Sequence, residues 1–255
     1  FVGQVGEVAL AAVGMGGFAN WLFISVLIGL GAGVQSITAR RLGEGEDERV
    51  ASGLNAALIV AFAVGVPWAL LGTTLAPSIF DLLVDDPAVR LLGGQYLGAR
   101  FVAAPCVAAN FAFRGFWNGT NRPTLYMGTL VCMHLLNIVL DYGLIFGNLG
   151  MPRLGAVGAG WATTISVGVG TLIYVHLGMR RARPQGFLRR RGNRAVLARL
   201  LRLSAPACLQ QLTFSAGFVA FFVIAGRIGT EELAASSVIL NLILICVLPG
   251  LGLGL

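Results

Sequence analysis

Apolar stretches separated by short polar connections recur along the whole chain. Each stretch matches or exceeds the roughly 20 residues that an α-helix needs to cross the hydrocarbon core of a bilayer. The pattern predicts seven spans, at 9–38, 51–79, 91–113, 124–147, 156–178, 204–226 and 233–255. The first is too long for one crossing, so we expect its end to project past the membrane. The chain is therefore expected to form an all-α, polytopic transmembrane helix bundle.

Arginines are distributed unequally among the connections between these spans. Fourteen of them fall in one set of alternate connections and three in the other. The arginine-rich set is 39–50, 114–123 and 179–203, and the arginine-poor set is 1–8, 80–90, 148–155 and 227–232. By the positive-inside rule the arginine-rich set is cytoplasmic, which places residue 1 outside. If the protein starts in the cytoplasm, an odd number of spans, most simply one, precedes residue 1.

The composition agrees with a membrane protein. The chain is 56% hydrophobic and 11% charged, whereas about a quarter of the residues of a soluble domain are charged. The net charge of +7 follows the placement of the connections, so we expect no nucleic-acid partner. The four cysteines stand singly in apolar stretches and predict neither a disulfide framework nor a metal site.

The long basic connection Arg180–Leu203 contains no acidic residue. We expect a solvated linker whose second part, Ala195–Leu203, forms an amphipathic stretch on the membrane surface. Binding of anionic lipid head groups by its arginines is the alternative.

Asp141 is the only acidic residue that lies well inside an apolar stretch. The other ten acidic residues occupy polar connections or the ends of spans. A charge near mid-membrane costs about 2.5–3.5 kcal/mol on insertion scales, so an acid at this depth indicates a function. The alternative is a protonated Asp that packs by hydrogen bonding to a neighbouring helix.

His134, Asn137 and Asp141 share one stripe of a helix, because spacings of three and four residues match the helical period. Asp141 lies about 9 Å from the outer end of its span, and Thr163 lies about 10 Å from the outer end of the next span. The carboxylate, the amide carbonyl and the hydroxyl can therefore meet at one level. These oxygens suit a small hard cation such as Na⁺, and the same carboxylate can instead carry a proton.

Two further polar residues inside the spans have roles that the sequence leaves open. His134 lies one turn further toward the cytoplasm and is a candidate proton relay, whereas a neutral His bonded to a neighbouring helix is the alternative. Arg100 either reaches the outer interface by snorkelling or pairs inside the bundle.

The last segment of the chain resembles the first at a constant offset of 223 residues. The matching blocks are Gly3–Gly6 with Gly226–Gly229, Leu10–Ala12 with Leu233–Ala235, and Gly29–Gly31 with Gly252–Gly254. The offset spans an even number of helices, so the two halves keep the same orientation and form parallel repeats. The chain is then expected to hold seven spans of twelve, with four after residue 255. Chance similarity between helices rich in Gly, Ala and Leu is the alternative.

Several longer motifs point to a known family. They are Phe1–Gly3 with Leu10–Ala12, Ala39–Gly45, Phe113–Phe116 with Asn121–Thr124, Asn137–Tyr142 and Gly155–Thr163. With these motifs the chain resembles the multidrug and toxic compound extrusion (MATE) family of antiporters over essentially its whole length. The resemblance implies two lobes that rock about a central cavity, with entry of Na⁺ or H⁺ driving the efflux of small organic cations.

The resemblance also implies how the chain is divided. Residues 1–178 are expected to form the N-terminal transmembrane lobe without most of its first helix. Residues 179–203 are the cytoplasmic basic linker, and residues 204–255 are the first two helices of the C-terminal lobe.

The resemblance places a cation site on Asn137 and Asp141 with Thr163. It adds an Asp in the first helix of the lobe, so the site is incomplete within this sequence. One branch of the family carries an essential Glu in the span where this chain has Gln210 and Gln211. That span holds no acid here, which favours coupling through Asp141.

Other functions fit parts of the sequence. A lipid-linked glycan flippase of the wider superfamily shares the architecture, although its anionic substrate favours a cationic cavity and few arginines are buried here. A third reading is a fragment incompetent in transport, because half of the pathway is missing. We expect no enzyme, since we find no H-E-x-x-H motif, paired acids or Ser/His pair at helical spacing. A monomeric multi-pass protein of the bacterial cytoplasmic (inner) membrane is expected, with organic cations and membrane lipid as partners and no bound cofactor.

Overall fold

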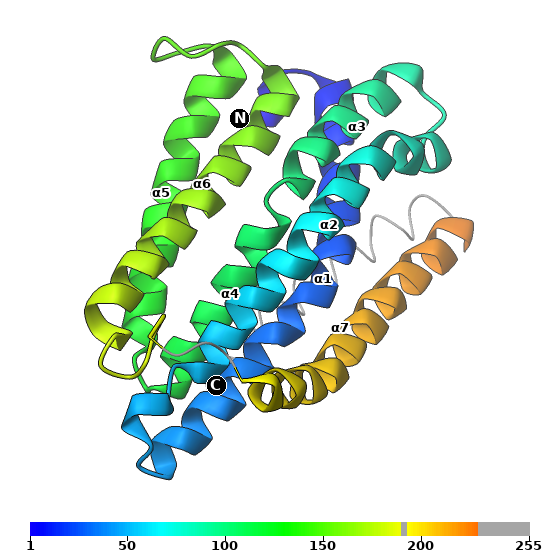
Figure 1. Ribbon diagram of the computed structural model, residues 1–255. Coiled ribbons are helices and arrows are strands. Elements are labelled where there is room, and N and C mark those ends of the chain that lie inside the picture. The colour runs from blue at the N-terminus through cyan, green and yellow to red at the C-terminus, as the bar shows by residue number, and fades with distance from the viewer. Residues whose placement is uncertain (190–192, 229–255) are drawn as a thin grey trace.

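The computed structural model describes residues 1–189 and 193–228, and this part of the chain contains helices and no strand (Figure 1). Its α-helices are α1 (Glu7–Gly43), α2 (Ser52–Leu83), α3 (Pro87–Phe101), α4 (Ala104–Gly119), α5 (Pro123–Phe146), α6 (Gly155–Leu177) and α7 (Arg194–Ile228). Short helical turns adjoin α1, α2 and α6, at η1 (Val2–Gln4), η2 (Asp47–Arg49) and η3 (Gly178–Ala182). The all-α class predicted from the sequence is confirmed.

Most of the expected spans are observed as helices that can cross a membrane. By length and composition these are α1, α2 with η2, α5, and α6 with η3. A fifth is the pair α3 and α4, whose axes differ by 47°. At about 1.5 Å per residue, the 37 residues of α1 exceed the bilayer core, as expected. The expected span 204–226 lies in α7, which is not among these helices, and 233–255 lies outside the described residues.

The break between α3 and α4 departs from the continuous span expected at 91–113. Pro105 stands in the first turn of α4, where its missing N–H costs no hydrogen bond. Gly65 of α2 packs directly on this proline, since a Cβ at position 65 would lie 2.6 Å from the Cα of Pro105. The apolar pattern continues on both sides of the bend, so hydrophobicity alone does not locate the break.

The helices form a compact group with α5 attached at its side. Helices α1 to α4 pack on one another, whereas α5 packs mainly on α6 (Figure 1). Helix α6 in turn contacts α3 and α4. Phe113 of α4 stacks on Tyr174 of α6 with ring centroids 5.4 Å apart, and both side chains are buried. Helix α6 therefore connects α5, which carries Asp141, to the core of the lobe.

Helix α7 lies against α1 on the opposite side of the group from α5 (Figure 1). Gly29 and Gly33 of α1 permit the close approach, since a Cβ at Gly29 would lie 2.5 Å from the backbone nitrogen of Cys208. Two glycines one turn apart are a common device for close helix packing in membranes. The stretch Ala195–Leu203, expected on the membrane surface, forms the first turns of α7 and runs without a break into 204–226. The domain boundary at 203 stays a prediction.

The arginine-rich connections meet at one end of the bundle. The backbone N–H of Ala51 donates to the carbonyl of Gln185 at 3.0 Å, which joins the connection after α1 to the connection after α6. The connection after α4 begins beside the end of α1, where a Cβ at Gly119 would lie 2.9 Å from the Cβ of Thr38. The side of the membrane on which this end lies stays a prediction.

Part of the expected linker is packed onto the lobe and not solvated. Asn55 of α2 donates from Nδ2 to the carbonyl of Gly186 at 2.9 Å and accepts at Oδ1 from the N–H of Leu188 at 3.0 Å. Phe187 between them is 1% exposed and lies against Phe113. Because one buried amide satisfies two backbone groups, the turn can enter the core with the carbonyl of Gly186 and the N–H of Leu188 both paired. We call residues 182–188 the anchored turn.

Candidate functional site

Asp141 lies in the second half of α5, five residues before the last helical residue. The helix ends at Gly147, which adopts a left-handed conformation (φ 79°) and donates its N–H to the carbonyl of Gly143. Asp141 is half-buried, and its Oδ1 atom is buried without a hydrogen-bond partner among the described residues. Burying a carboxylate oxygen without a hydrogen-bond partner costs free energy, so this position favours a bound ligand.

Asn137 and Thr163 meet as the sequence predicts. Asn137 Nδ2 donates to Thr163 Oγ1 at 3.4 Å, and Thr163 Oγ1 donates to the carbonyl of Ala159 at 3.0 Å. The meeting depends on the close approach of α5 and α6 at Gly158, where a Cβ would lie 2.5 Å from the carbonyl oxygen of Leu144. Asp141 follows Asn137 by one turn of α5, and its carboxylate makes no hydrogen bond to this amide or hydroxyl.

His134 belongs to the same stripe of α5, but its environment differs from that of Asn137 and Asp141. Its side chain is exposed, and it makes no hydrogen bond or salt bridge to the residues that the structure describes. The structure shows no hydrogen bond from His134 to Asn137 or Asp141. Its role as a proton relay stays a prediction.

Helix α3 contributes residues to this region that the sequence did not assign to the site. Tyr96 is 7% exposed and packs with Ile145 of α5 and Ala159 of α6. Thr164 Oγ1 donates to the carbonyl of Ala99 at 2.7 Å, which fixes α3 against α6. The sequence did contain an indication of this role of α3, because Tyr96 and Arg100 are spaced one turn apart and so share one helix face.

Arg100 lies inside the bundle with no partner. Its Nε atom is buried and makes no hydrogen bond, and no salt bridge to Arg100 occurs within residues 1–189 and 193–228. Its positive charge acts on both Tyr96 and Asp141. Of the two placements left open by the sequence, the described residues form no ion pair with Arg100, and the snorkelling side chain stays a prediction.

The ligand chemistry of the site is limited to oxygen. No group of three or more His, Cys, Asp or Glu side chains gathers anywhere in the described part of the chain. One carboxylate, one amide and one hydroxyl can hold a proton or a hard monovalent cation, whereas zinc and other transition metals favour imidazole and thiolate ligands.

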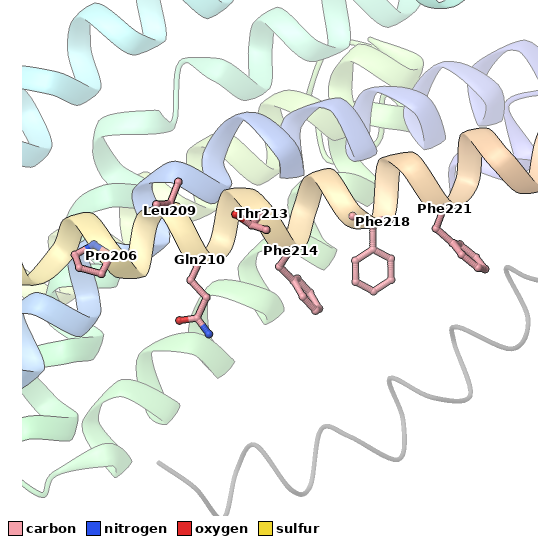
Figure 2. Close-up of a pocket in the computed structure, with 8 residues that line it drawn as sticks. Pro206, Leu209, Gln210, Thr213, Phe214, Phe218 and Phe221 are labelled. Atoms are coloured by element: carbon pink, nitrogen blue, oxygen red, sulfur yellow. The ribbon is translucent and has the colours of Figure 1, made fainter.

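A second region of interest is an open pocket of about 810 Å³ along α7. Figure 2 shows Gln210, Phe214 and Phe218 projecting from one side of the helix. The lining residues are Pro206, Leu209, Gln210, Thr213, Phe214, Gly217, Phe218 and Phe221, none of which is charged. The pocket is thus apolar and aromatic, with Gln210 in place of an acid.

Comparison with known proteins identifies the family of the chain. The family model MatE matches residues 1–143. The chain is 28% identical over 240 residues to the probable multidrug resistance protein YoeA of Bacillus subtilis, covering 92% of this chain and 52% of that protein. It is 28% identical over 260 residues to the probable multidrug resistance protein NorM of Bradyrhizobium diazoefficiens, covering 100% of this chain and 55% of that protein. The chain spans about half the length of these curated relatives.

Solved structures show the same fold. A MATE protein in complex with MaL6 superimposes with a TM-score of 0.86 at 25% identity, covering 98% of this chain and 56% of that chain. The outward-facing conformation of a multidrug resistance MATE family transporter of the MOP superfamily gives a TM-score of 0.84 at 26% identity, with the same coverage. An inward-facing conformation gives 0.77 at 26% identity, covering 96% of this chain and 56% of that chain. Because the family model covers more than half of the chain and the helices superimpose, the chain belongs to MatE, which is a family of transporters and not of enzymes.

Proposed function

We propose that the transporter containing this chain exports small organic cations in exchange for Na⁺ or H⁺, and that Asp141, Asn137 and Thr163 bind the coupling ion. The names of the relatives as multidrug resistance proteins support the export function. Membership in a family of ion-coupled antiporters supports the exchange.

The observation that carries the site is the unpartnered oxygen of Asp141. Buried carboxylate oxygens in folded proteins normally accept hydrogen bonds, and a structural Asp would do so here. Asp141 Oδ1 accepts none from the described residues, although Asn137 and Thr163 hydrogen-bond to each other one turn away. A proton or Na⁺ on Asp141 would satisfy this oxygen and remove its charge from the bilayer interior.

The position of the site suits loading from outside. The chain superimposes better on an outward-facing conformation, with a TM-score of 0.84, than on an inward-facing one, with 0.77. If the arginine-rich end is cytoplasmic, Asp141 in the second half of α5 lies toward the outer surface. An ion that enters there neutralises the carboxylate of Asp141 before the transporter changes from the outward-facing to the inward-facing conformation. The negative charge of Asp141 is then compensated during that change.

The pocket on α7 supports a cationic substrate. Its lining combines three phenylalanines with no charged side chain. Aromatic faces attract organic cations within about 6 Å of the ring centroid, whereas an anionic lipid-linked glycan would require basic groups. The cation exporter is therefore favoured over the flippase.

The test is Asp141→Asn in the full-length transporter, expressed in bacteria that lack their own efflux pumps. We expect export of a fluorescent organic cation to be abolished, because Asn cannot carry a proton or a negative charge. Membrane insertion, measured by the amount of protein in the membrane fraction, is expected to stay normal.

Asp47→Asn is the matched control, since Asp47 is an exposed acid in a connection. It is expected to export the dye at the wild-type rate. Normal resistance in cells carrying Asp141→Asn would reduce Asp141 to a packing residue and remove the proposed site.

A further inference from the structure

Arg100 and Asp141 lie at the same depth in the bundle. Tyr96 of α3 and Ile145 of α5 belong to one buried cluster, so they mark a common level. The two helices run in opposite directions, because α3 leaves the end at which α5 finishes (Figure 1). Arg100 follows Tyr96 by one turn and Asp141 precedes Ile145 by one turn. Both steps are about 6 Å in the same direction along the bundle.

Each of these side chains contains a buried polar atom without a partner. The Nε atom of Arg100 and the Oδ1 atom of Asp141 make no hydrogen bond to the described residues. No salt bridge joins the two in the described structure, although the charge of Arg100 acts on Asp141. Direct contact between the guanidinium and the carboxylate would give each of these two buried atoms a partner of opposite charge.

The backbone beneath Arg100 is held in place, so only its side chain needs to move. The bond from Thr164 Oγ1 to the Ala99 carbonyl fixes α3 to α6, and Gly160 packs on the same turn. Thr163 is adjacent to Thr164 and hydrogen-bonds to Asn137. Arg100 is thus attached to the helix that supplies the third oxygen of the candidate site.

We propose that Arg100 is a tethered counter-charge for the coupling-ion site: its guanidinium binds the carboxylate of Asp141 when the ion has left and is displaced when the ion binds. This inference rests on the proposed function of Asp141. A guanidinium does not lose its proton, so it competes with Na⁺ or H⁺ and never replaces them as the transported ion. The competition weakens ion binding and stabilises the empty site, which promotes release.

Among the described residues, Tyr96 on α3 is another ionisable side chain that interacts electrostatically with Asp141. The facing residue of α6, Thr163, is neutral, and His134 on α5 itself is exposed. Arg100 is therefore the basic side chain within the spans whose removal should change ion binding.

The test compares Arg100→Leu with Arg100→Lys in the full-length transporter reconstituted in lipid vesicles. We expect Arg100→Leu to lower the half-saturating concentration of the coupling ion about tenfold, whether this is measured against Na⁺ or against pH. Arg100→Lys keeps the charge and should restore most of the wild-type value. Arg90→Gln is the control. Arg90 lies in the first turn of the same helix, α3, and pairs with Asp85 at 3.6 Å.

A second measurement needs no transport activity. In thermal unfolding of the purified, ion-free protein at alkaline pH, Arg100→Leu and Asp141→Asn should each lower the Tm. The double variant should lose no more than the worse single variant, because coupled partners are not additive. Additive losses, or a wild-type half-saturation in Arg100→Leu, would overturn the role of Arg100. Retention of ion dependence by Asp141→Asn would instead overturn the proposed function.

Discussion

The two ends of the Asn137 side-chain amide have different roles, one in packing and one in ion binding. Its Nδ2 group donates to Thr163 and fixes the side chain. Its Oδ1 atom makes no hydrogen bond to the described residues and remains available as a ligand one turn from Asp141. Because the same hydrogen bond orients both residues, loss of either side chain should disturb the other.

We expect Asn137→Ala and Thr163→Ala each to raise the half-saturating concentration of the coupling ion about tenfold. Each variant removes one oxygen donor and one hydrogen bond, and such a bond contributes about 1 kcal/mol. Transport rate against Na⁺ concentration and against pH is the measurement.

The control is Ser166→Ala, on the same helix as Thr163, α6. Ser166 is buried, and its hydroxyl bonds to the carbonyl four residues earlier, as that of Thr163 does. It should leave the half-saturation unchanged. If Asn137→Ala and Thr163→Ala also keep wild-type values for both ions, the site lies elsewhere.

The sequence could predict only the part of the site that depends on helical spacing. Asn137 and Asp141 share a stripe of α5, and Thr163 lies at a matching depth in the next helix. Arg100 depends instead on the rotation of a third helix, which the bond from Thr164 to Ala99 and the bend after Phe101 determine. Tertiary contacts of this kind produce no periodic pattern of residues, so they cannot be predicted from the sequence pattern.

At the scale of helices, the site depends on how closely α5 and α6 approach each other. Gly158 faces the carbonyl of Leu144 so closely that a Cβ would lie 2.5 Å from the oxygen. Gly168, on the same helix, has no atom within 4 Å of such a Cβ. The two glycines therefore separate the effect of helix spacing from that of helix propensity.

We expect Gly158→Ala to destabilise the protein by about 1–3 kcal/mol and to raise the half-saturating ion concentration, because the helices must move apart. Gly168→Ala should be neutral or stabilise by up to about 1 kcal/mol, since Ala favours helix more than Gly does. Thermal unfolding in detergent and ion-dependent transport measure both. Equal behaviour of the two variants would contradict the importance of this contact.

The helix positions followed from hydrophobicity more reliably than the breaks between them. Apolar runs predicted α1, α2, α5 and α6, because a bilayer imposes both length and composition on a span. The anchored turn was missed, since it arises from one specific contact at Asn55. The bend between α3 and α4 lies at Pro105, a residue type that bends helices and is visible in the sequence.

At the scale of the whole molecule, the arginine-rich connections gather at one end, and we expect that end to be cytoplasmic. Single cysteines at Pro87, Pro152 and Pro184, which are all exposed, test this orientation. In a background without the four native cysteines, an impermeant thiol reagent applied to intact cells should label positions 87 and 152 but not 184. The opposite pattern would invert the topology and remove the reason for loading Asp141 from outside. Position 186 is unsuitable for a cysteine, because Gly186 is buried with a φ of +89°.

The repeat predicted from the sequence stays a prediction. Its second copy lies mainly in residues 229–255, outside the described part of the chain. The same holds for the expected span 233–255. The gathering of arginines, in contrast, was predictable, because alternation of the connections follows directly from the number of spans between them.

The anchored turn shortens the tether between the lobe and α7. Asn55 holds the chain as far as Leu188, and α7 starts at Arg194, so few residues separate a fixed point from a long rod. A helix of 35 residues is about 52 Å long. A tilt of about 10° around its tethered start would carry its other end through about 9 Å, while the start hardly moved. Any tilt of α7 about this start would therefore turn a small rotation at one surface into a wide displacement at the other.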